Sequence, residues 1–221
     1  MSDADVFVPE PPTPDSTFWY RFGRTGCAWM LKLYNRLSIE GRENVPTDGP
    51  FLMVSNHQSL LDIPILGAAT DRHLCFVARG SLADSKVLGW WLHQCRSILI
   101  QPGAPDRAAL RAIEAHLELG DAVAIFPEGT RSRDGSLQTP RGGAFFSARR
   151  AGVPIVPVGI SGAIDAWPRD ARLPAPKKIV LRIGTPLDGR DRDAPDRCWE
   201  QVRALVGSPA AVDRSDSGPR P

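Results

Sequence analysis

The sequence predicts an α/β fold with a largely parallel sheet, on three observations. From residue 38 onward, short apolar runs rich in β-branched and aromatic residues alternate with amphipathic stretches. The runs are continuously apolar, which is typical of strands covered on both faces. The amphipathic stretches end near glycine, as helices commonly do. Strand and helix in alternation favour helices layered around parallel strands.

Length and composition predict one domain between two tails. The chain has 221 residues, 42% of them hydrophobic and 24% charged, which is enough for one buried core. Residues 1–16 are acidic and proline-rich, and residues 208–221 are polar without periodicity, so both are predicted to be disordered. Between them we expect a helical segment over 17–37 and a domain over 38–207. The net charge of +2, without a Lys/Arg-rich block, argues against nucleic acid as a partner.

The segment over 17–37 predicts an amphipathic helix. Its apolar stripe follows steps of three and four residues, through Trp19, Phe22, Gly26, Met30, Leu33 and Leu37. The opposite face is basic and carries Arg21, Arg24, Lys32 and Arg36. One interpretation is a helix lying on the surface of an anionic membrane, and the other is a helix docked on its own domain. Gly23 and Gly26 lower helix propensity and allow a break into two short helices.

The remaining elements follow in chain order. Continuous apolar runs predict strands over 51–56, 73–78, 97–101, 122–128, 153–160 and 177–184. Amphipathic stretches predict helices over 107–121, 141–152 and 194–207. No internal repeat interrupts this order.

Cysteine usage and hydropathy restrict the setting of the protein. The cysteines have neither CxxC nor metal-ligand spacing, so we expect reduced thiols in a cytosolic protein at Cys27, Cys75, Cys95 and Cys198. The first residues lack the basic and apolar parts of a signal peptide. No apolar run reaches the roughly 18 residues of a membrane-spanning helix, so any membrane contact is expected to be peripheral.

The stretch SNHQSLLD, residues 55–62, places a histidine and a carboxylate where an apolar strand ends. Such strand ends line the crevice in which open α/β sheets bind their ligands. His57 and Asp62 would lie about 140° apart on one helix, so they converge only if His57 lies in the loop and Asp62 begins the next helix. Two local signals permit this: a capping box from Ser59 to Asp62, or Asp62 itself as N-cap with Pro64 in the first turn.

In that geometry Asp62 would fix the tautomer of His57, and the free ring nitrogen would take a proton. The sequence offers no evident serine or cysteine nucleophile in a sharp turn, so the base would activate a hydroxyl of the substrate. The alternative is that His57 and Asp62 have only loop and capping roles. The other histidines, His73, His93 and His116, have no partner at an informative spacing and are interpreted as structural or surface residues.

A second concentrated motif, AIFPEGTRS at residues 124–132, also follows an apolar strand. Pro127 stops further central pairing of the strand, and Gly129 permits a close approach of the backbone to a ligand. A guanidinium can clamp a phosphate at two points, so an anionic substrate head is expected here, with a charged turn as the alternative. The polar groups of the motif are Glu128, Thr130, Arg131 and Ser132.

NHQSLLD and FPEGTRS, in this order and at this distance, resemble the lysophosphatidate acyltransferase family of glycerolipid acyltransferases. The stretches VARGSLADSKVLGWWL and RGGAFFSARRAGVPIVPVGI are similar to further family regions, and the resemblance covers roughly residues 38–185. It implies a mixed, mostly parallel sheet flanked by helices, the glycerolipid acyltransferase fold. It also implies that the amphipathic segment is a membrane-contacting one, held at the cytoplasmic face of the inner membrane.

The activity implied is transfer of a fatty acyl group from acyl-CoA or an acyl carrier protein thioester to a free hydroxyl of a lysophospholipid. The acceptor most closely implied is 1-acylglycerol-3-phosphate, giving phosphatidate, with no metal or organic cofactor. His57 would be the base and Asp62 would orient it. The resemblance assigns the glycerophosphate head to Glu128, Gly129 and Arg131, with Thr130 and Ser132 as lesser candidates.

One departure from the family concerns the acceptor. The second family motif usually reads close to FIDR, and the matching stretch here ends in Gln101, which lacks the positive charge of the arginine. Arg96, Arg107 or Arg141 could replace that charge, and we prefer Arg141. The alternatives are another acceptor, such as a lyso-aminolipid, a lipid-binding protein without turnover, or a thioesterase. Residues 89–92, GWWL, are interpreted as core or as a wall for the acyl chain.

Overall fold

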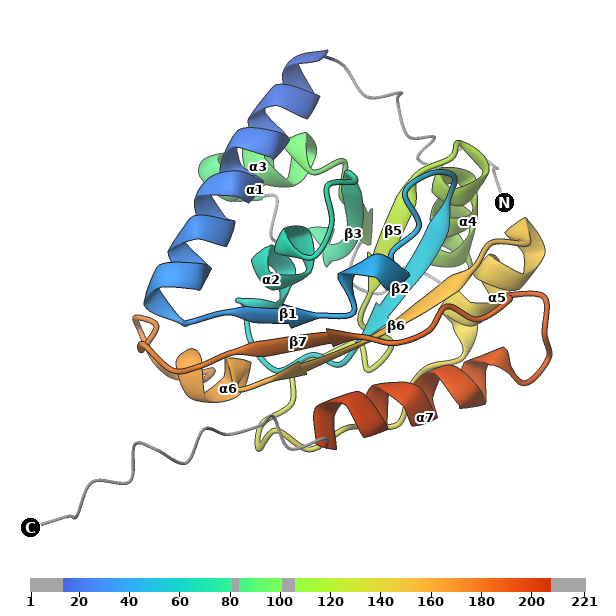
Figure 1. Ribbon diagram of the computed structural model, residues 1–221. Helices are drawn as coiled ribbons and strands as arrows, with labels where there is room; N and C mark the ends of the chain where they lie inside the picture. Colours follow the sequence, from blue (N-terminus) through green and yellow to red (C-terminus); the bar gives the residue numbers. More distant parts are fainter. Residues whose placement is uncertain (1–13, 81–83, 101–105, 208–221) are drawn as a thin grey trace, which may run out of the picture.

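The computed structural model describes residues 14–80, 84–100 and 106–207, and is built around one seven-stranded sheet (Figure 1). The sheet order is β1-β7-β6-β2-β5-β3-β4. The strands are β1 (Ser38–Glu40), β2 (Phe51–Ser55), β3 (Leu74–Arg79), β4 (Ile98–Ile100), β5 (Ala122–Ile125), β6 (Ile155–Ser161) and β7 (Val180–Ile183). All six predicted strands are present. Sequence reasoning missed β1, because Ser38–Glu40 has a single apolar residue and therefore forms no apolar run.

The mixed, mostly parallel sheet of the prediction is confirmed. Every neighbouring pair runs parallel except β6 and β7, which are antiparallel. In the centre, Leu52 of β2 lies opposite Val123 of β5 and Ile155 of β6. The carboxyl ends of these three strands therefore meet at one edge of the sheet, where α/β sheets bind their ligands.

Helices follow most strands and cover the sheet. They are α1 (Pro14–Tyr34), α2 (Asp62–Ala68), α3 (Lys86–Gln94), α4 (Asp106–Glu118), α5 (Gly143–Ala151), α6 (Ala163–Ala166) and α7 (Ala194–Gly207), with a short 3-10 helix η1 (Arg42–Asn44). The predicted helices over 107–121, 141–152 and 194–207 correspond to α4, α5 and α7. In α7 the final glycine belongs to the helix and does not follow it.

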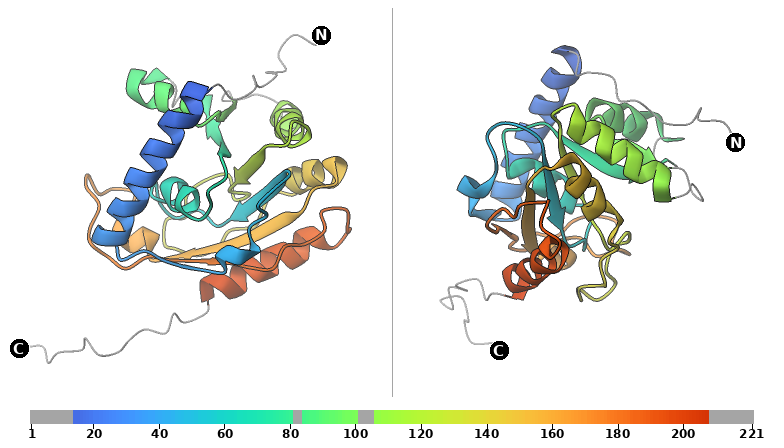
Figure 2. Two further views of the ribbon diagram at one scale, coloured as in Figure 1. Left: turned by 45° about the horizontal axis from the view of Figure 1, so that its top comes forward. Right: turned by 90° about the vertical axis from the view of Figure 1, so that its right-hand side faces the viewer.

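The core consists of two apolar layers, one on each face of the sheet. In β2, Phe51 and Met53 pack with residues of α1 and α2, whereas Leu52 and Val54 pack with residues of α4, α5 and α7. All five residues of β2 are buried. Figure 2 shows β3 and β5 between α1 and α4, so helices lie on both sides of the sheet. This arrangement explains why the central strands are apolar throughout.

The N-terminal helix α1 is unbroken, so Gly23 and Gly26 do not divide it. It begins inside the tail predicted over 1–16 and ends before residue 37. The rest of both predicted tails lies outside the described residues. α1 packs on α2 and α3, so it is docked on its own domain.

The side of α1 that faces the domain combines the buried Leu31 with polar and ring contacts. The Tyr20 ring stacks on His73 at a centroid distance of 3.8 Å, and its hydroxyl accepts the Leu74 N–H at 3.1 Å. Arg24 Nη1 donates to the carbonyl of Thr70 at 2.7 Å and to Asp71 at 2.8 Å. The predicted apolar stripe is therefore not the docked side.

The apolar stripe of α1 lies on the surface of the domain. Its large exposed side chains are Phe18, Trp19, Phe22, Trp29, Met30 and Leu33. Trp90 of α3 is also exposed and packs edge-on against Trp19, with centroids 5.8 Å apart. In the described part of the chain, no helix is both long and apolar enough to span a bilayer. The structure thus combines a docked helix with an uncovered aromatic face.

Candidate active site

The candidate site lies at the carboxyl ends of β2, β5 and β6. Asn56, immediately after β2, fixes this edge through its side-chain amide. Its Nδ2 donates to the carbonyl of Ile160 at 2.9 Å, and its Oδ1 accepts the Ile160 N–H at 2.8 Å. The buried side-chain amide thus bonds the backbone of β6 in the way that a paired strand would. The next residue, His57, lies in the loop beyond the end of β2.

The turn from His57 to Asp62 is built around one carboxylate oxygen. Asp62 Oδ2 accepts the backbone N–H of Gln58 at 2.6 Å and of Ser59 at 2.7 Å, and contacts His57 Nδ1 at 2.8 Å. Ser59 Oγ accepts the N–H of Leu61 at 3.3 Å. The return bond from Ser59 to Asp62 is that of a capping box. His57 and Asp62 converge as predicted, with one in the loop and the other at the start of α2.

The ring of His57 is oriented for proton transfer. A carboxylate only accepts hydrogen bonds, so Nδ1 of the neutral imidazole must carry the proton and Nε2 has a free lone pair. The ring stacks on Phe126, with centroids 4.0 Å apart and planes 13° apart. The His57 side chain is 17% exposed and Asp62 is fully buried. The His57 ring is therefore reachable from solvent, whereas the carboxylate that orients it is not.

The FPEGTRS motif holds the main chain of His57 on both sides. Glu128 Oε1 accepts the backbone N–H of His57 at 2.9 Å, and its Oε2 accepts the N–H of Gln138 at 3.0 Å. The Ser132 N–H donates to the His57 carbonyl at 2.8 Å. The two sequence motifs therefore form one hydrogen-bonded unit, through two residues, Glu128 and Ser132, that the family resemblance assigned to the substrate.

Glu128 has an environment unlike that of an open binding residue. It is 4% exposed, and backbone N–H groups occupy both of its carboxylate oxygens. Burial raises the pKa of Glu128, and the hydrogen bonds from Gln138 and His57 partly offset this rise. Ser132 is also buried, and its hydroxyl accepts the Gly135 N–H at 3.0 Å. Both side chains are committed to the loop itself.

Gly129 and Arg141 lie against each other. Gly129 has a φ of 71°, in the left-handed region that favours glycine, and a Cβ there would lie 3.4 Å from the guanidinium carbon of Arg141. The Arg141 N–H also donates to the Pro127 carbonyl at 2.9 Å. The structure therefore brings Arg141 to the motif, although it comes from the start of α5.

The other predicted binding residues divide into two groups. Thr130 is exposed and Arg131 is half-buried, so both are accessible in the loop after Gly129. Arg96 is not at the site, because it pairs with Asp121 at the opposite edge of the sheet. Arg107 is exposed in the first turn of α4. Gln101, the departure from the family pattern, lies outside the described residues.

Two arginines beside the site were not singled out from the sequence. Arg133 and Arg169, with Asp170, line a hollow of about 310 Å³. Residues close to them in the chain contact the turn from His57 to Asp62: the Ser132 N–H donates to the His57 carbonyl, and the Trp167 carbonyl accepts the Ser59 hydroxyl at 3.0 Å. Neither arginine belongs to a motif, so only the position of its neighbours reveals this placement.

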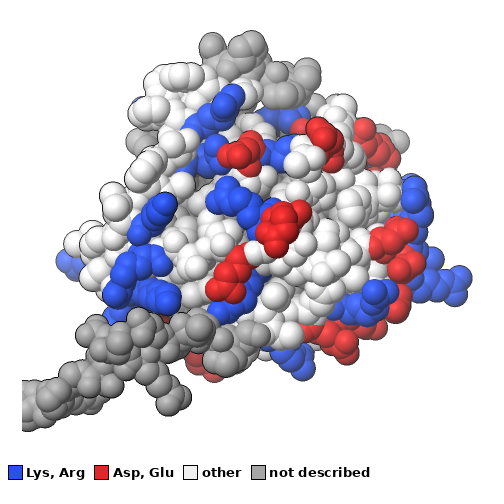
Figure 3. Space-filling model, viewed as in Figure 1, with Lys and Arg blue, Asp and Glu red and all other residues white. Residues whose placement is uncertain are grey.

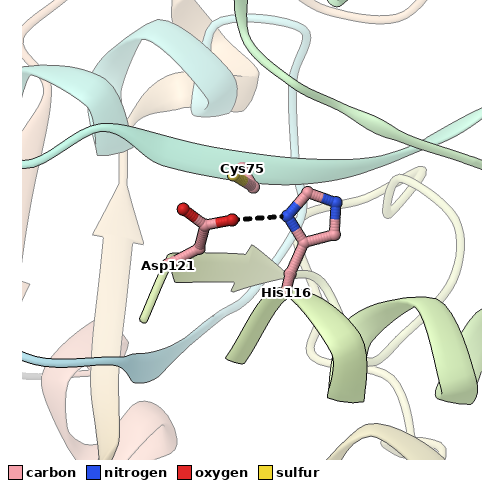
Figure 4. A group of neighbouring side chains, drawn as sticks. All are labelled: Cys75, His116 and Asp121. Carbon is pink, nitrogen blue, oxygen red and sulfur yellow. Dashed lines mark hydrogen bonds and ion pairs between the residues drawn. The ribbon is translucent and has the colours of Figure 1, made fainter. Parts of the chain in front are cut away.

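A second histidine–aspartate pair gives His116 a partner and agrees with its interpretation as a structural residue. His116 Nδ1 lies 2.8 Å from Asp121 Oδ2, the same sequence spacing and the same distance as in the His57–Asp62 pair. Sequence reasoning was wrong to find no partner at an informative spacing for His116. The pair lies at the amino end of β5, away from the candidate site, and His116 is fully buried. Figure 4 shows it beside Cys75.

Cys75, His116 and Asp121 are also close enough to hold a cation, because their ligand atoms lie within 4.8 Å of one another. Arg96 opposes this. Its Nη1 contacts the second oxygen of Asp121 at 2.5 Å, so a guanidinium already neutralises the carboxylate. Burial raises the pKa of the Cys75 thiol, which disfavours the thiolate that a metal needs. This cluster is better described as a buried ion pair beside a neutral thiol. All four cysteines are free.

Comparisons with known proteins assign the chain to a family. A family model described as Acyltransferase matches residues 36–161, more than half of the chain. The chain is 35% identical over 139 residues to the chloroplastic 1-acyl-sn-glycerol-3-phosphate acyltransferase LPAT1 of Arabidopsis thaliana. It is 35% identical over 149 residues to the lyso-ornithine lipid O-acyltransferase of Pseudomonas aeruginosa. These alignments cover 61% and 66% of this chain.

A solved structure has the same fold. The 1-acyl-sn-glycerophosphate acyltransferase PlsC from Thermotoga maritima superposes with a TM-score of 0.71 at 27% identity, covering 88% of this chain and 80% of that one. Alignment with the chain covers 38% of the Arabidopsis protein and 56% of the Pseudomonas protein. Both shares are under two thirds of the relatives' own length.

Proposed function

The chain belongs to the acyltransferase family, and from that premise we propose that it transfers a fatty acyl group from a thioester to a free hydroxyl of a lysophospholipid. The observation that carries the proposal is the contact of His57 Nδ1 with Asp62 Oδ2 at 2.8 Å. This contact leaves Nε2 free, on a partly exposed ring at the carboxyl edge of the sheet. Simple lipid binding has no need of an oriented base.

The proposed chemistry uses His57 twice. Its Nε2 takes the proton of the acceptor hydroxyl as that oxygen attacks the thioester carbonyl, and the bond from carbon to sulfur then breaks. The proton passes to the departing thiolate, so an ester and a free thiol are formed. Asp62 is the positioning residue: it holds the tautomer and stabilises the imidazolium that forms between the two steps. The reaction as proposed needs no metal or organic cofactor, and its donor is acyl-CoA or an acyl carrier protein.

The acceptor is proposed to be 1-acylglycerol-3-phosphate, which would give phosphatidate. Arg131 and Arg141 are accessible beside Gly129, and two guanidinium groups match the charge and geometry of a phosphate monoester. Arg141 is the residue that would replace the charge missing at Gln101. Thr130 can add a hydroxyl contact. Glu128 and Ser132 are proposed to act through the main chain of His57 and not on the substrate.

A second acceptor class has one specific observation in its favour. The relative from Pseudomonas aeruginosa is named a lyso-ornithine lipid acyltransferase and is as similar in identity as the plant relative, at 35%. Together with Gln101, this supports a lyso-aminolipid as the alternative acceptor. The two acceptors differ in the charge of the head, so they are separable by assay.

The exposed aromatic face of α1 supports a membrane-surface location for the reaction. Trp19, Phe22 and Leu33 present apolar area to the outside, and amphipathic helices of this kind lie at the boundary between headgroups and acyl chains. We propose that the enzyme works peripherally on the cytoplasmic face of the inner membrane.

The test follows thiol release from acyl-CoA and from an acyl carrier protein thioester, with lysophosphatidate, a lyso-ornithine lipid or no acceptor. The wild type is compared with His57→Ala. The expected result is release that requires an acceptor and falls by about 10² to 10⁴ in the variant. Release without any acceptor would identify a thioesterase instead. Equal rates in the two proteins would remove His57 from the mechanism and favour lipid binding without turnover.

A further inference from the structure

We propose that a basic hollow beside α1 binds the phosphate of an anionic phospholipid of the bilayer, at a site separate from the catalytic one. The hollow has a volume of about 220 Å³ and lies between α1, α2 and η1. Its lining residues are Arg24, Thr25, Ala28, Trp29, Lys32, Arg42 and Ala68. Three positive side chains thus converge on a space large enough for a headgroup phosphate.

Two of the positive groups are held in place by the end of α2. Arg42 Nη2 donates to the Ala68 carbonyl at 2.7 Å, and Arg24 Nη1 donates to the Thr70 carbonyl at 2.7 Å. Each bond leaves other N–H groups of the guanidinium for a ligand. Arg24 Nε is buried and has no partner among the described residues. Because carbonyls fix the guanidinium groups, little side-chain entropy remains to be lost on binding.

The hollow also lies beside the exposed apolar face of α1, where the headgroup of a bound lipid would lie. On a helix turning by about 100° per residue, Lys32 lies on a strip between the docked side of α1 and its exposed apolar face. Trp29 belongs to both the hollow and the apolar face, and Lys32 Nζ lies 5.8 Å from the centroid of the Trp29 ring. A lipid whose chains contact the apolar face would therefore place its phosphate near Lys32.

The charge of the surface agrees with this ligand. Figure 3 shows Lys and Arg side chains following the length of α1, whereas most Asp and Glu side chains of that face lie away from it. Asp71 is the acidic neighbour, and it is 85% exposed and paired with Arg24. The lining therefore keeps a net positive charge, because Asp71 pairs with Arg24 and not with Lys32 or Arg42.

This inference rests on the proposed function, since an enzyme of bilayer lipids must hold its active site at the bilayer. The experiment measures binding of the full chain to vesicles of phosphatidylcholine, with and without phosphatidylglycerol, for the wild type, Lys32→Gln and Arg21→Gln. Arg21 is the matched control, because it lies exposed on the same strip about three turns away and does not line the hollow.

If the hollow binds a lipid phosphate, Lys32→Gln should weaken binding to the anionic vesicles by about tenfold or more, because the variant loses a charge-assisted hydrogen bond as well as a charge. Arg21→Gln should weaken it by about fivefold or less, the effect of one charge near an anionic surface. Both should bind neutral vesicles like the wild type. Arg42→Gln should repeat the result of Lys32→Gln, and thermal unfolding checks that each variant is folded.

Equal losses in Lys32→Gln and Arg21→Gln would overturn the site and leave only diffuse attraction. Binding of soluble glycerol 3-phosphate is measured in the absence of vesicles. If the wild type binds it and Lys32→Gln does not, the assignment of the hollow to a bilayer lipid is contradicted. Turnover on a lysolipid in detergent micelles is measured separately for the wild type. Failure of that assay alone would contradict the proposed function, whereas the vesicle comparison requires no turnover.

Discussion

Glu128 accepts the backbone N–H of His57 at 2.9 Å, so the carboxylate of one motif fixes the main chain of the other. The same loop returns through Ser132, whose N–H donates to the His57 carbonyl at 2.8 Å. Together with the bond from His57 Nδ1 to Asp62, these contacts restrain the histidine from three directions. A histidine restrained in this way would need little reorganisation to act as the proposed base.

The first prediction separates the turn-forming role of Asp62 from its role toward His57. Asp62→Asn keeps, at the position of Oδ2, an oxygen that accepts the N–H groups of Gln58 and Ser59 and the Nδ1–H of His57, but its neutral amide no longer stabilises the imidazolium. We expect kcat to fall by about 10³, with a small loss of stability. Asp62→Ala should lose kcat similarly and unfold about 2 kcal/mol more easily. Acyl-transfer kinetics and urea denaturation check both; unchanged kcat in Asp62→Asn would contradict the assigned role.

The second prediction concerns Glu128. Glu128→Gln retains one acceptor oxygen, so the N–H of either His57 or Gln138 loses its partner and the fold loses about 1 to 2 kcal/mol. Because His57 is then less well placed, kcat should fall by about tenfold while KM for the acceptor stays nearly unchanged. Steady-state kinetics with thermal unfolding make the measurement. A large rise in KM with no loss of stability would instead place Glu128 on the substrate.

The third prediction uses three glycines to isolate the contact with Arg141. Gly129→Ala should lose about 1 kcal/mol from its φ of 71° and should also displace the guanidinium of Arg141, so that KM for an anionic acceptor rises. Gly120→Ala has a similar φ of 87° and no atom within 4 Å of the new Cβ, so it should lose only stability. Gly142→Ala, at a φ of −69°, should change neither the stability nor the KM. A KM change shared by Gly120→Ala would refute the contact argument.

The fourth prediction concerns the effect of pH on the ion pair that Asp121 forms with Arg96 and His116. Burial alone would raise the pKa of Asp121, but hydrogen bonds from His116 and Arg96 outweigh it and lower the pKa below its usual 3.8. The pair therefore stabilises the fold above pH 3.8, and this stability is lost as the pH falls below that value. Asp121→Asn should lower the free energy of unfolding by about 2 kcal/mol near neutral pH and progressively less in acid.

Urea denaturation at neutral pH and in acid, on wild type and Asp121→Asn, measures that difference. Acyl transfer should be little affected in the variant while it is folded, since Asp121 lies at the amino end of β5. A stability difference that stayed constant into acid would show that the ionised form of Asp121 is not what stabilises the fold.

Much of the fold was predictable because its signals are local. Six strands were found as continuous apolar runs, and the structure buries every residue of β2 and β5 between two helical layers. β1 was missed because its sequence, Ser38–Glu40, has a single apolar residue, so the strand is defined only by its pairing with β7. The docked side of α1 was also missed, because Tyr20, His73 and Arg24 hold it through polar and ring contacts that a hydrophobic pattern does not report.

The candidate site was predictable in part for the same reason. The spacing from His57 to Asp62 permits a contact within one turn, and the structure makes that contact. The role of Glu128 was not predictable, because its partner His57 is 71 residues away and is bound through a backbone atom. Arg141, preferred from the sequence, lies beside Gly129 only because the loop between them folds back.

By itself, the sequence determined which segments form strands, which residues can act as a base and an orienting carboxylate, and the family to which the motifs belong. Spacing alone does not distinguish the pair His57–Asp62 from the pair His116–Asp121, which have the same spacing and the same contact distance of 2.8 Å. The tertiary structure shows how the environments of the two pairs differ. One pair lies at the carboxyl edge of the sheet with its ring partly open to solvent, and the other is buried at the amino edge against Arg96. Exposure and neighbouring charge are properties of the packed chain, so no local pattern encodes them.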